Sequence, residues 1–270
     1  MRIAILSDIH GNAIALEAVL RDLERQGIDE IIIPGDLFAF GPAPNDVFSM
    51  LQQLPKARYL IGNTDRYLIQ ASYPTSPGGD GWQDRLLLSF KWTAERLKSE
   101  AFQFLNTLPT TQTLRHHNWL LLAVHGSPRS DEEGLTIKTE AETLDEMSID
   151  PQVNMLVCGH THVPMERLVA GMRVVNAGSV GLSFDGDPRA CYAIISSVPV
   201  NGHHSTHVRL KRVAYDIEKA VEQFYALNHP AADISAFNLR TGRSMGSSLI
   251  YTPKMRYSGR TAAIPALQPA

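Results

Sequence analysis

The sequence predicts an α/β protein in which two β-sheets stack and helices cover their outer faces. In the first half, short apolar runs alternate with amphipathic segments, an order typical of parallel strands joined by right-handed helical crossovers. In the last third, short apolar segments are separated by turn residues, which favours antiparallel pairing. The length of 270 residues is enough for one large domain with a sizeable core.

The first half contains three expected strands and two expected helices. Ile3–Leu6 is an apolar run too short for helical periodicity, so it predicts a strand. Ala13–Gln26 places apolar residues three and four positions apart, as an amphipathic helix does, and Gly27 ends it. The other elements expected here are the strand Glu30–Pro34, the helix Pro44–Leu54 and the strand Arg58–Ile61.

The middle of the chain begins with an expected loop, because Ser72–Trp82 is rich in proline and glycine. This loop is a candidate substrate lid, and surface decoration is the alternative. The elements expected after it are the helices Gln83–Ser99 and Ala101–Thr107, the strands Trp119–Val124 and Asn154–Cys158, and the loop Gly126–Gly134.

The last third predicts a run of short strands and one helix. These are the strands Met165–Val169, Met172–Asn176, Ala190–Ser196 and His207–Val213, and the helix Ala214–Leu227. From Asn238 onward the periodicity is lost among Ser, Gly, Pro and isolated apolar residues. We therefore expect one domain over residues 1–237 and an extended or partly disordered tail over residues 238–270. The tail is also a candidate contact in a homo-oligomer.

The composition excludes fibrous, secreted and membrane proteins. The formal charge of −3 gives no basic excess for nucleic acid or for a membrane surface. Two cysteines, Cys158 and Cys191, cannot form a disulfide framework. No apolar run approaches the roughly 18–20 residues that span a bilayer, and the first residues lack the layout of a signal peptide. We expect a cytoplasmic protein that binds neither membranes nor nucleic acid.

Polar side chains follow five of the expected strands, at the point where each strand ends. They lie in the segments Asp8-Ile9-His10-Gly11-Asn12, Gly35-Asp36, Gly62-Asn63-Thr64-Asp65, His125-Gly126 and Gly159-His160-Thr161-His162. Because ligands of α/β sheets bind outside the carboxyl ends of the strands, we expect these side chains to meet. Glycines beside each motif allow the backbone to turn sharply and to approach a ligand closely.

The seven candidate metal ligands are Asp8, His10, Asp36, Asn63, His125, His160 and His162. Imidazole, carboxylate and amide groups together suit a divalent ion such as Mn, Fe, Ni or Zn. Seven ligands exceed what one tetrahedral ion takes, but they match two ions that share one carboxylate. Each motif alone also has a structural explanation as a helix cap, a turn or a core histidine. The occurrence of all five motifs at strand ends favours the metal site.

In this order the five motifs resemble those of the calcineurin-like metallophosphoesterases, and the resemblance extends from Arg2 to about Val213. The segment Asn176–Gly181 and the following Asp185–Arg189 are similar to small bacterial members of that family. The resemblance implies a four-layer αββα sandwich, with two mixed sheets stacked face to face and helices outside. It also implies two divalent cations, Mn first and Fe, Ni or Zn as alternatives, and a small phosphate ester as substrate.

The same resemblance implies a role for each ligand. Asp8, His10 and His162 would hold one metal, Asn63, His125 and His160 would hold the other, and Asp36 would bridge them. A hydroxide between the two metals would be the nucleophile that attacks phosphorus in line.

One position departs from the family pattern. Many members carry a histidine where this chain has Thr64, and that histidine assists the leaving group. A hydroxyl cannot act as a general acid near pH 7, and the small bacterial branch, which often lacks this histidine, tends to act on phosphodiesters. We therefore expect phosphodiester hydrolysis. The alternatives are a phosphomonoesterase, a dinucleoside-polyphosphate hydrolase and a non-catalytic interaction scaffold.

The candidate substrate contacts are Asn12, Thr64 and Arg66, with Arg189 as a further phosphate contact. Asn12 is equally suited to cap the first helix, and Arg66 to form an exposed ion pair. Structural roles are favoured elsewhere: a solvated turn for His116 and His117, a surface hairpin for the histidines between residues 203 and 207, and a buried strand position for Cys158.

Overall fold

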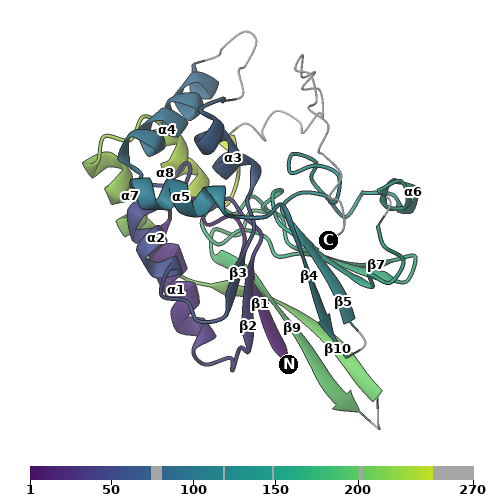
Figure 1. The fold of residues 1–270 in the computed structure, drawn as a ribbon. Coiled ribbons are helices and arrows are strands. Elements are labelled where there is room, and N and C mark those ends of the chain that lie inside the picture. Colours follow the sequence, from purple (N-terminus) through teal and green to yellow (C-terminus); the bar gives the residue numbers. More distant parts are fainter. Residues whose placement is uncertain (74–80, 118, 148, 201–202, 246–270) are drawn as a thin grey trace.

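Two five-stranded mixed β-sheets form the centre of the fold (Figure 1). The computed structural model describes residues 1–73, 81–117, 119–147, 149–200 and 203–245. In spatial order, the first sheet contains β10 (His203–Val213), β9 (Ala190–Val200), β1 (Arg2–Ile5), β2 (Glu30–Ile33) and β3 (Ala57–Tyr59). The second sheet contains β4 (Thr111–His116), β5 (Trp119–Val124), β6 (Met155–Cys158), β8 (Met172–Asn176) and β7 (Met165–Val169). The expected α/β fold with two mixed sheets is confirmed.

Both sheets mix parallel and antiparallel pairing. In the first sheet the three parallel strands β1, β2 and β3 extend to one edge, and the hairpin of β9 and β10 forms the other side. β1 pairs in parallel with β2, with Ile3 opposite Glu30, and β2 pairs in parallel with β3. β9 runs antiparallel to both β1 and β10. In the second sheet β5, β6 and β8 are parallel, and the edge strands β4 and β7 are antiparallel to their neighbours.

Helices cover the outer faces of the sheets. They are α1 (Ala13–Leu23), α2 (Pro44–Leu51), α3 (Asn63–Gln70), α4 (Trp82–Arg96), α5 (Ser99–Asn106), α6 (Ala141–Asp145), α7 (Ile217–Ala226) and α8 (Ala232–Thr241). Figure 1 shows α1, α2 and α5 beside the first sheet and α6 on the far side of the second sheet. None of the described helices is long and apolar enough to cross a membrane.

The alternation of side chains along β1 divides the core into layers. Ile3 and Ile5 pack between the two sheets in a cluster with Val157 of β6, whereas Ala4 packs on the other face of the first sheet with Leu16 of α1. Successive residues of a strand point to opposite faces, so a strand that is buried on both faces is apolar throughout. The apolar run at the start of the chain therefore belongs to a strand at the middle of the sandwich.

Four elements of the structure have no counterpart among the expected ranges: α3, β4, α6 and α8. β4 is an edge strand whose residues alternate between exposed and half-buried, so it contains no apolar run. α8 continues to Thr241 and ends at Gly242 in the left-handed conformation, so it crosses the expected domain boundary between residues 237 and 238. Residues 74–80 of the expected loop and residues 246–270 of the expected tail lie outside the described residues.

Several element bounds differ from those expected. α1 ends at Leu23 and α2 ends at Leu51, each three residues before the end that the sequence predicts. The β9–β10 hairpin is longer than expected, because the two strands continue to pair with each other as far as His203 opposite Val200. Figure 1 shows this hairpin projecting beyond the rest of the first sheet.

Candidate metal centre

Five strand ends bring seven polar side chains together. The side chains are Asp8 and His10 after β1, Asp36 after β2, Asn63 after β3, His125 after β5, and His160 and His162 after β6. Contacts between side-chain atoms of 3.5 Å or less connect all seven in one continuous series. The tertiary structure thus brings together the whole set of ligands that the motifs predict.

The backbone is strained at most of these positions. The φ angle is positive at Asp8 (55°), His10 (48°), Asp36 (56°), His160 (65°) and His162 (59°). Non-glycine residues rarely adopt this left-handed region, and each instance costs about 1–3 kcal/mol. Strain of this kind persists only where the surrounding structure holds it, and it concentrates at functional sites.

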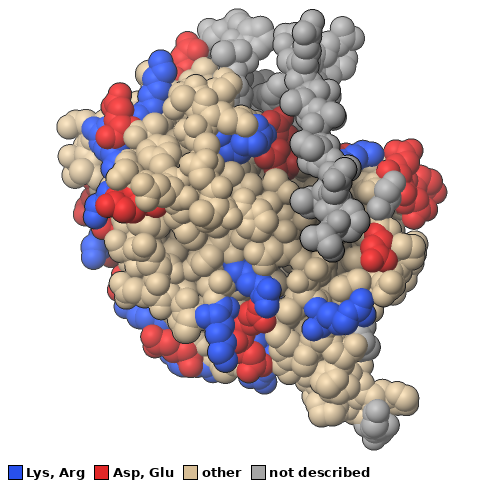
Figure 2. All heavy atoms as spheres, viewed as in Figure 1, with Lys and Arg blue, Asp and Glu red and all other residues tan. Residues whose placement is uncertain are grey.

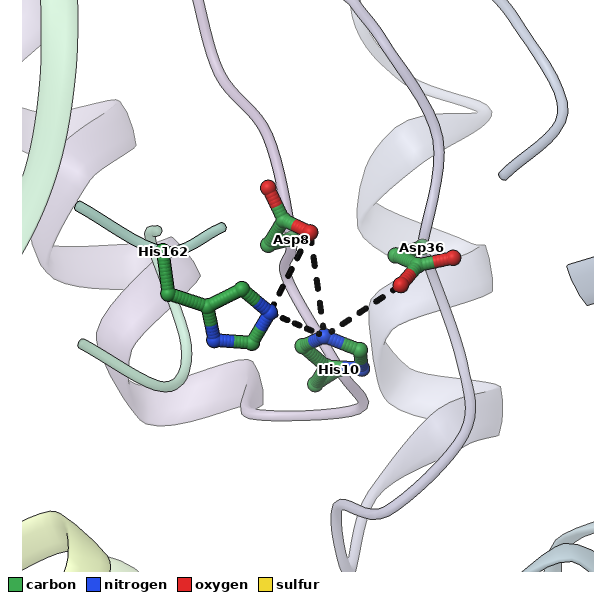
Figure 3. A group of neighbouring side chains, drawn as sticks. All are labelled: Asp8, His10, Asp36 and His162. Carbon is green, nitrogen blue, oxygen red and sulfur yellow. Dashed lines mark hydrogen bonds and ion pairs between the residues drawn. The ribbon is translucent and has the colours of Figure 1, made fainter. Parts of the chain in front are cut away.

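Asp8, His10, Asp36 and His162 form the half of the centre drawn in Figure 3. These four side chains are buried, and one ligand atom of each lies within 4.8 Å of the others. Nε2 of His10 lies 3.1 Å from Nε2 of His162 and 3.5 Å from Oδ2 of Asp36. Nε2 of His162 lies 3.3 Å from Oδ1 of Asp8. The four groups therefore point at one small volume.

Asn63, His125 and His160 form the other half. Oδ1 of Asn63 lies 2.9 Å from Nε2 of His125 and 3.2 Å from Nδ1 of His160. Oδ2 of Asp36, the oxygen that faces His10, also lies 3.5 Å from Nε2 of His125. Asp36 is therefore the side chain shared by the two halves.

Every histidine of the centre donates one ring hydrogen to a backbone carbonyl. The pairs are His10 Nδ1 with Ala39 (3.1 Å), His125 Nδ1 with Pro34 (2.6 Å), His160 Nε2 with Glu132 (3.1 Å) and His162 Nδ1 with Leu182. Because a carbonyl oxygen only accepts, the opposite nitrogen of each neutral ring carries a lone pair. These lone pairs face one another and the oxygens of the site, an arrangement that a bound cation satisfies. The donor set of imidazole, carboxylate and amide fits a divalent transition metal.

The electrostatics of the buried groups favour a positive charge at the centre. Burial raises the pKa of the Asp36 carboxyl, but His125 and His10 outweigh burial and hold it well below its usual range. Burial opposes a charge on His125, but Asp36 and Asp8 raise its pKa to about 10. Burial lowers the pKa of His10 to about 4, against the opposing effect of Asp36. In the absence of metal, a proton on His125 thus compensates the carboxylates.

Two glycines allow the second and third motifs to come together. Gly35 has a φ of 92°, and a Cβ atom there would lie 2.3 Å from the backbone nitrogen of Gly62. A Cβ atom at Gly62 would lie 2.2 Å from Oδ1 of Asp36. Only residues without side chains permit this approach, which places Asp36 beside Asn63.

Asp65 has a supporting role that the motif alone did not reveal. Its carboxylate accepts hydrogen bonds from the backbone nitrogens of Leu37 (3.0 Å) and Gly62 (3.3 Å), so it ties the loop after β2 to the start of α3. Burial, together with the charge of Asp36, raises the pKa of Asp65 to about 7. No local pattern predicts the bond to Leu37, because the two residues are 28 positions apart.

The expected substrate contacts have other partners in the structure. The Asn12 side chain caps α1 by accepting from the nitrogen of Ala15 (3.1 Å) and donates to the carbonyl of Gly181 (3.0 Å). The Thr64 hydroxyl is buried and has no hydrogen-bond partner among the described residues. Arg66 forms ion pairs with acidic residues of the loop after β5, and Arg189 pairs with Asp187.

Two aromatic rings that no sequence motif indicates flank the histidines of the first half. The ring of Phe184 stacks on His162 with centroids 4.4 Å apart, and the ring of Phe40 lies 5.4 Å from that of His10. Phe40 also has a positive φ of 76°. Neither residue lies in a recognisable motif.

The structural roles expected for other histidines and for Cys158 are largely confirmed. His203, His204 and His207 lie on the β9–β10 hairpin, and Cys158 is buried in β6. His117 is exposed, but His116 is half-buried at the end of β4, where its Nε2 atom has no partner among the described residues.

Comparisons with known proteins agree with this geometry. Residues 1–198 match the calcineurin-like phosphoesterase superfamily domain. The chain is 29% identical to a metallophosphoesterase from Sphaerobacter thermophilus, whose crystal structure superposes with a TM-score of 0.70 over 90% of this chain and 100% of that one. A hypothetical protein from Pyrococcus horikoshii has the same fold, with 21% identity and a TM-score of 0.74 over 90% of this chain and 99% of that one. An uncharacterized protein of Methanocaldococcus jannaschii is 27% identical over 239 residues, which are 82% of this chain and 90% of that protein.

Proposed function

This chain belongs to the calcineurin-like phosphoesterase superfamily and is a metal-dependent phosphoric ester hydrolase, and from that premise we propose that it hydrolyses a phosphodiester at a centre of two divalent cations. The observation that carries the proposal is the position of Asp36. One oxygen of its carboxylate lies 3.5 Å from Nε2 of His10 and 3.5 Å from Nε2 of His125. A carboxylate between two sets of ligands is the arrangement that a pair of metal ions requires.

The remaining ligands divide between the two cations. Asp8, His10 and His162 would hold one ion, and Asn63, His125 and His160 would hold the other. Mn²⁺ is the cation we propose first, with Fe, Ni or Zn as alternatives, because all accept mixed nitrogen and oxygen ligands. When bound, the two cations would supply hydroxide near neutral pH and neutralise negative charge on the phosphoryl oxygens.

The residues of the chain supply orientation rather than proton transfer. Bonds to backbone carbonyls fix which ring nitrogen of each of the four histidines keeps its hydrogen when a cation is bound: Nδ1 in three of them and Nε2 in His160. The bond from the backbone nitrogen of Thr64 to Oδ1 of Asp36 (3.0 Å) leaves Oδ2 directed at the two histidines. These bonds preorganise the ligands, so a cation binds without rearrangement of the buried loops.

The preference for a diester follows from Thr64. Its hydroxyl is buried and does not ionise near pH 7, so it cannot protonate a poor leaving group. Diesters with a stabilised leaving group depend least on such an acid. On the face seen in Figure 2, Lys and Arg are interspersed with Asp and Glu among the described residues, which agrees with a small substrate rather than a nucleic acid. Two buried free cysteines agree with a reducing, cytoplasmic environment.

The test compares an aryl phosphodiester with the matching monoester, using protein that is stripped of metal and reloaded with Mn²⁺. We expect a higher kcat/KM for the diester. A preference for the monoester would replace the diester proposal with a phosphomonoesterase that uses another leaving-group acid. If neither ester turns over while two metals are bound, dinucleoside polyphosphates are the next substrates, and a scaffold function follows if these also fail.

A further inference from the structure

Arg66 lies on α3, three residues after Asn63, and each nitrogen of its guanidinium group has an acceptor within the protein. Its Nε and Nη2 atoms donate to the two oxygens of Asp131 at 2.7 and 2.9 Å, and Nη2 also donates to Oε1 of Glu132 at 2.8 Å. The third nitrogen, Nη1, lies 3.4 Å from Oε1 of Gln70. A bidentate ion pair with a carboxylate is the strongest hydrogen-bonded interaction that arginine forms with a side chain.

Glu132 connects this ion pair to the metal centre. Its carboxylate also accepts a hydrogen bond from the hydroxyl of Tyr67 (2.5 Å), so two residues of α3 hold the side chain. Its backbone carbonyl accepts a hydrogen bond from Nε2 of His160 at 3.1 Å. Because the carbonyl only accepts, this bond keeps the hydrogen on Nε2 and turns the lone pair of Nδ1 toward Asn63, 3.2 Å away.

His160 needs such support from outside its own segment. Its φ of 65° is in the left-handed region, and a histidine there is strained. The loop after β5 packs closely on it, because a Cβ atom at Gly134 would lie 2.6 Å from Cγ2 of Thr161 and 3.5 Å from Cδ2 of His160. The loop that contains Glu132 therefore lies directly against the strained segment.

We propose that Arg66 is a positioning residue for His160. Its guanidinium holds Asp131 and Glu132 together, and the Glu132 carbonyl then fixes the tautomer and the orientation of the His160 ring. Without Arg66 the two adjacent carboxylates repel each other, and the loop loses its main attachment to α3. The inference rests on the proposed function in one respect: the proposed function assigns His160 and Asn63 to the same cation.

This role differs from a contact with the substrate. All three guanidinium nitrogens of Arg66 have acceptors within the protein, so binding a phosphate would require those bonds to break. A substrate contact affects KM and leaves metal binding unchanged. A positioning residue affects metal binding and leaves KM unchanged once the metal is saturating.

The test is a calorimetric titration of metal-stripped Arg66→Gln with Mn²⁺ beside the wild type. Loss of an outer partner of a metal-ligating histidine typically lowers metal affinity by about 10- to 100-fold. We expect this loss at one of the two sites, no change at the other, and an unchanged KM at saturating Mn²⁺. Unchanged affinity at both sites, or a raised KM with normal metal binding, would overturn the inference.

Arg129→Gln is the matched control. Arg129 lies in the same loop but pairs with Glu133 and Glu146 rather than with Glu132, so its loss is expected to leave metal affinity unchanged. If Arg66→Gln does not fold, Tyr67→Phe removes one bond to Glu132 and is expected to give a smaller loss at the same site. An effect of Arg129→Gln as large as that of Arg66→Gln would contradict the specific role of Arg66.

A second measurement separates the inference from the proposed function. In metal-free protein, the nitrogen NMR shifts of the His160 ring report which nitrogen carries the hydrogen. We expect the Nε2–H form in the wild type and a mixture of tautomers in Arg66→Gln. A single Mn²⁺ site in the wild type would contradict the two-cation proposal alone, whereas unchanged tautomers in Arg66→Gln would contradict the positioning role alone.

Discussion

Nε2 of His10 lies 3.1 Å from Nε2 of His162. In each ring the other nitrogen, Nδ1, donates its hydrogen to a backbone carbonyl. In their neutral forms the two rings therefore direct lone pairs at each other. This contact is unfavourable without a positive charge nearby, and both residues also have strained backbones. The chain thus maintains, at a cost in stability, an arrangement that suits a cation.

The shared carboxylate predicts that Asp36→Asn weakens both metal sites at once. An amide keeps the size of the side chain but loses the charge that both sets of ligands face. We expect a loss of Mn²⁺ affinity above the roughly 10- to 100-fold that removal of an outer partner causes, measured as metal content after dialysis. Asp46→Asn, a change at an exposed carboxylate of α2, is the control. Retention of both metals by Asp36→Asn would disprove the bridging role.

The raised pKa of His125 predicts that metal affinity increases with pH. The pKa is about 10 without metal, so at pH 6–8 the ring carries a proton that a cation must displace. Each unit of pH below that value is expected to lower the apparent affinity by up to about tenfold. Mn²⁺ titrations at three pH values, in buffers with different enthalpies of ionisation, measure both the slope and the proton release. A pH-independent affinity would be inconsistent with this protonation.

Thr64→His is expected to accelerate hydrolysis of esters with poor leaving groups more than that of activated ones, because an imidazole can protonate the leaving oxygen. The measurement is kcat/KM across a series of aryl leaving groups. Thr64→Val keeps the size of the side chain and removes only a hydroxyl without a partner among the described residues, so it is expected to leave the series unchanged. If Thr64→His changes kcat/KM equally for all leaving groups, the wild type does not lack a leaving-group acid at this position.

Gly35→Ala is expected to destabilise the protein more than Gly171→Ala. Both glycines have similar φ angles, 92° and 87°, so each alanine would cost about 1–2 kcal/mol in backbone strain. A Cβ atom at Gly35 would also lie 2.3 Å from the nitrogen of Gly62, whereas at Gly171 nothing lies within 4 Å. Overpacking at Gly35 adds about 1–3 kcal/mol or more. Urea unfolding measures the difference, and equal losses would show that the close approach is not important.

His229 predicts a loss of stability in mild acid. Its ring packs against Trp92 and Phe224 and is only 4% exposed, and burial lowers its pKa to about 4. An unfolded histidine has a pKa near 6.5, so between pH 6.5 and 4 the unfolded chain binds more protons. The free energy of unfolding is therefore expected to fall over that range by about 2–3 kcal/mol. His229→Phe should reduce this dependence, whereas a change at the exposed His207 should retain it.

The local sequence was sufficient to identify most of the fold and the candidate ligands. The strands that precede Asp8 and His160 are buried on both faces, so they appear as apolar runs, and the ligands follow within a few residues. β4 escaped prediction because an edge strand with alternating exposure needs no apolar run. α8 was not predicted because polar residues separate its few apolar ones, so no helical periodicity is visible. Apolar contacts such as that of Leu239 nevertheless pack the helix onto the fold.

The order of the motifs along the chain established which side chains are available to a metal, because each ligand is within a few residues of a strand end. Their relative positions depend on the tertiary structure, since the contact between His10 and His162 joins residues 152 positions apart. The same holds for Arg66, whose partner Asp131 is 65 residues away. The strength of an ion pair depends on the distance between the two charges in the folded protein, and the local sequence around either residue does not determine that distance.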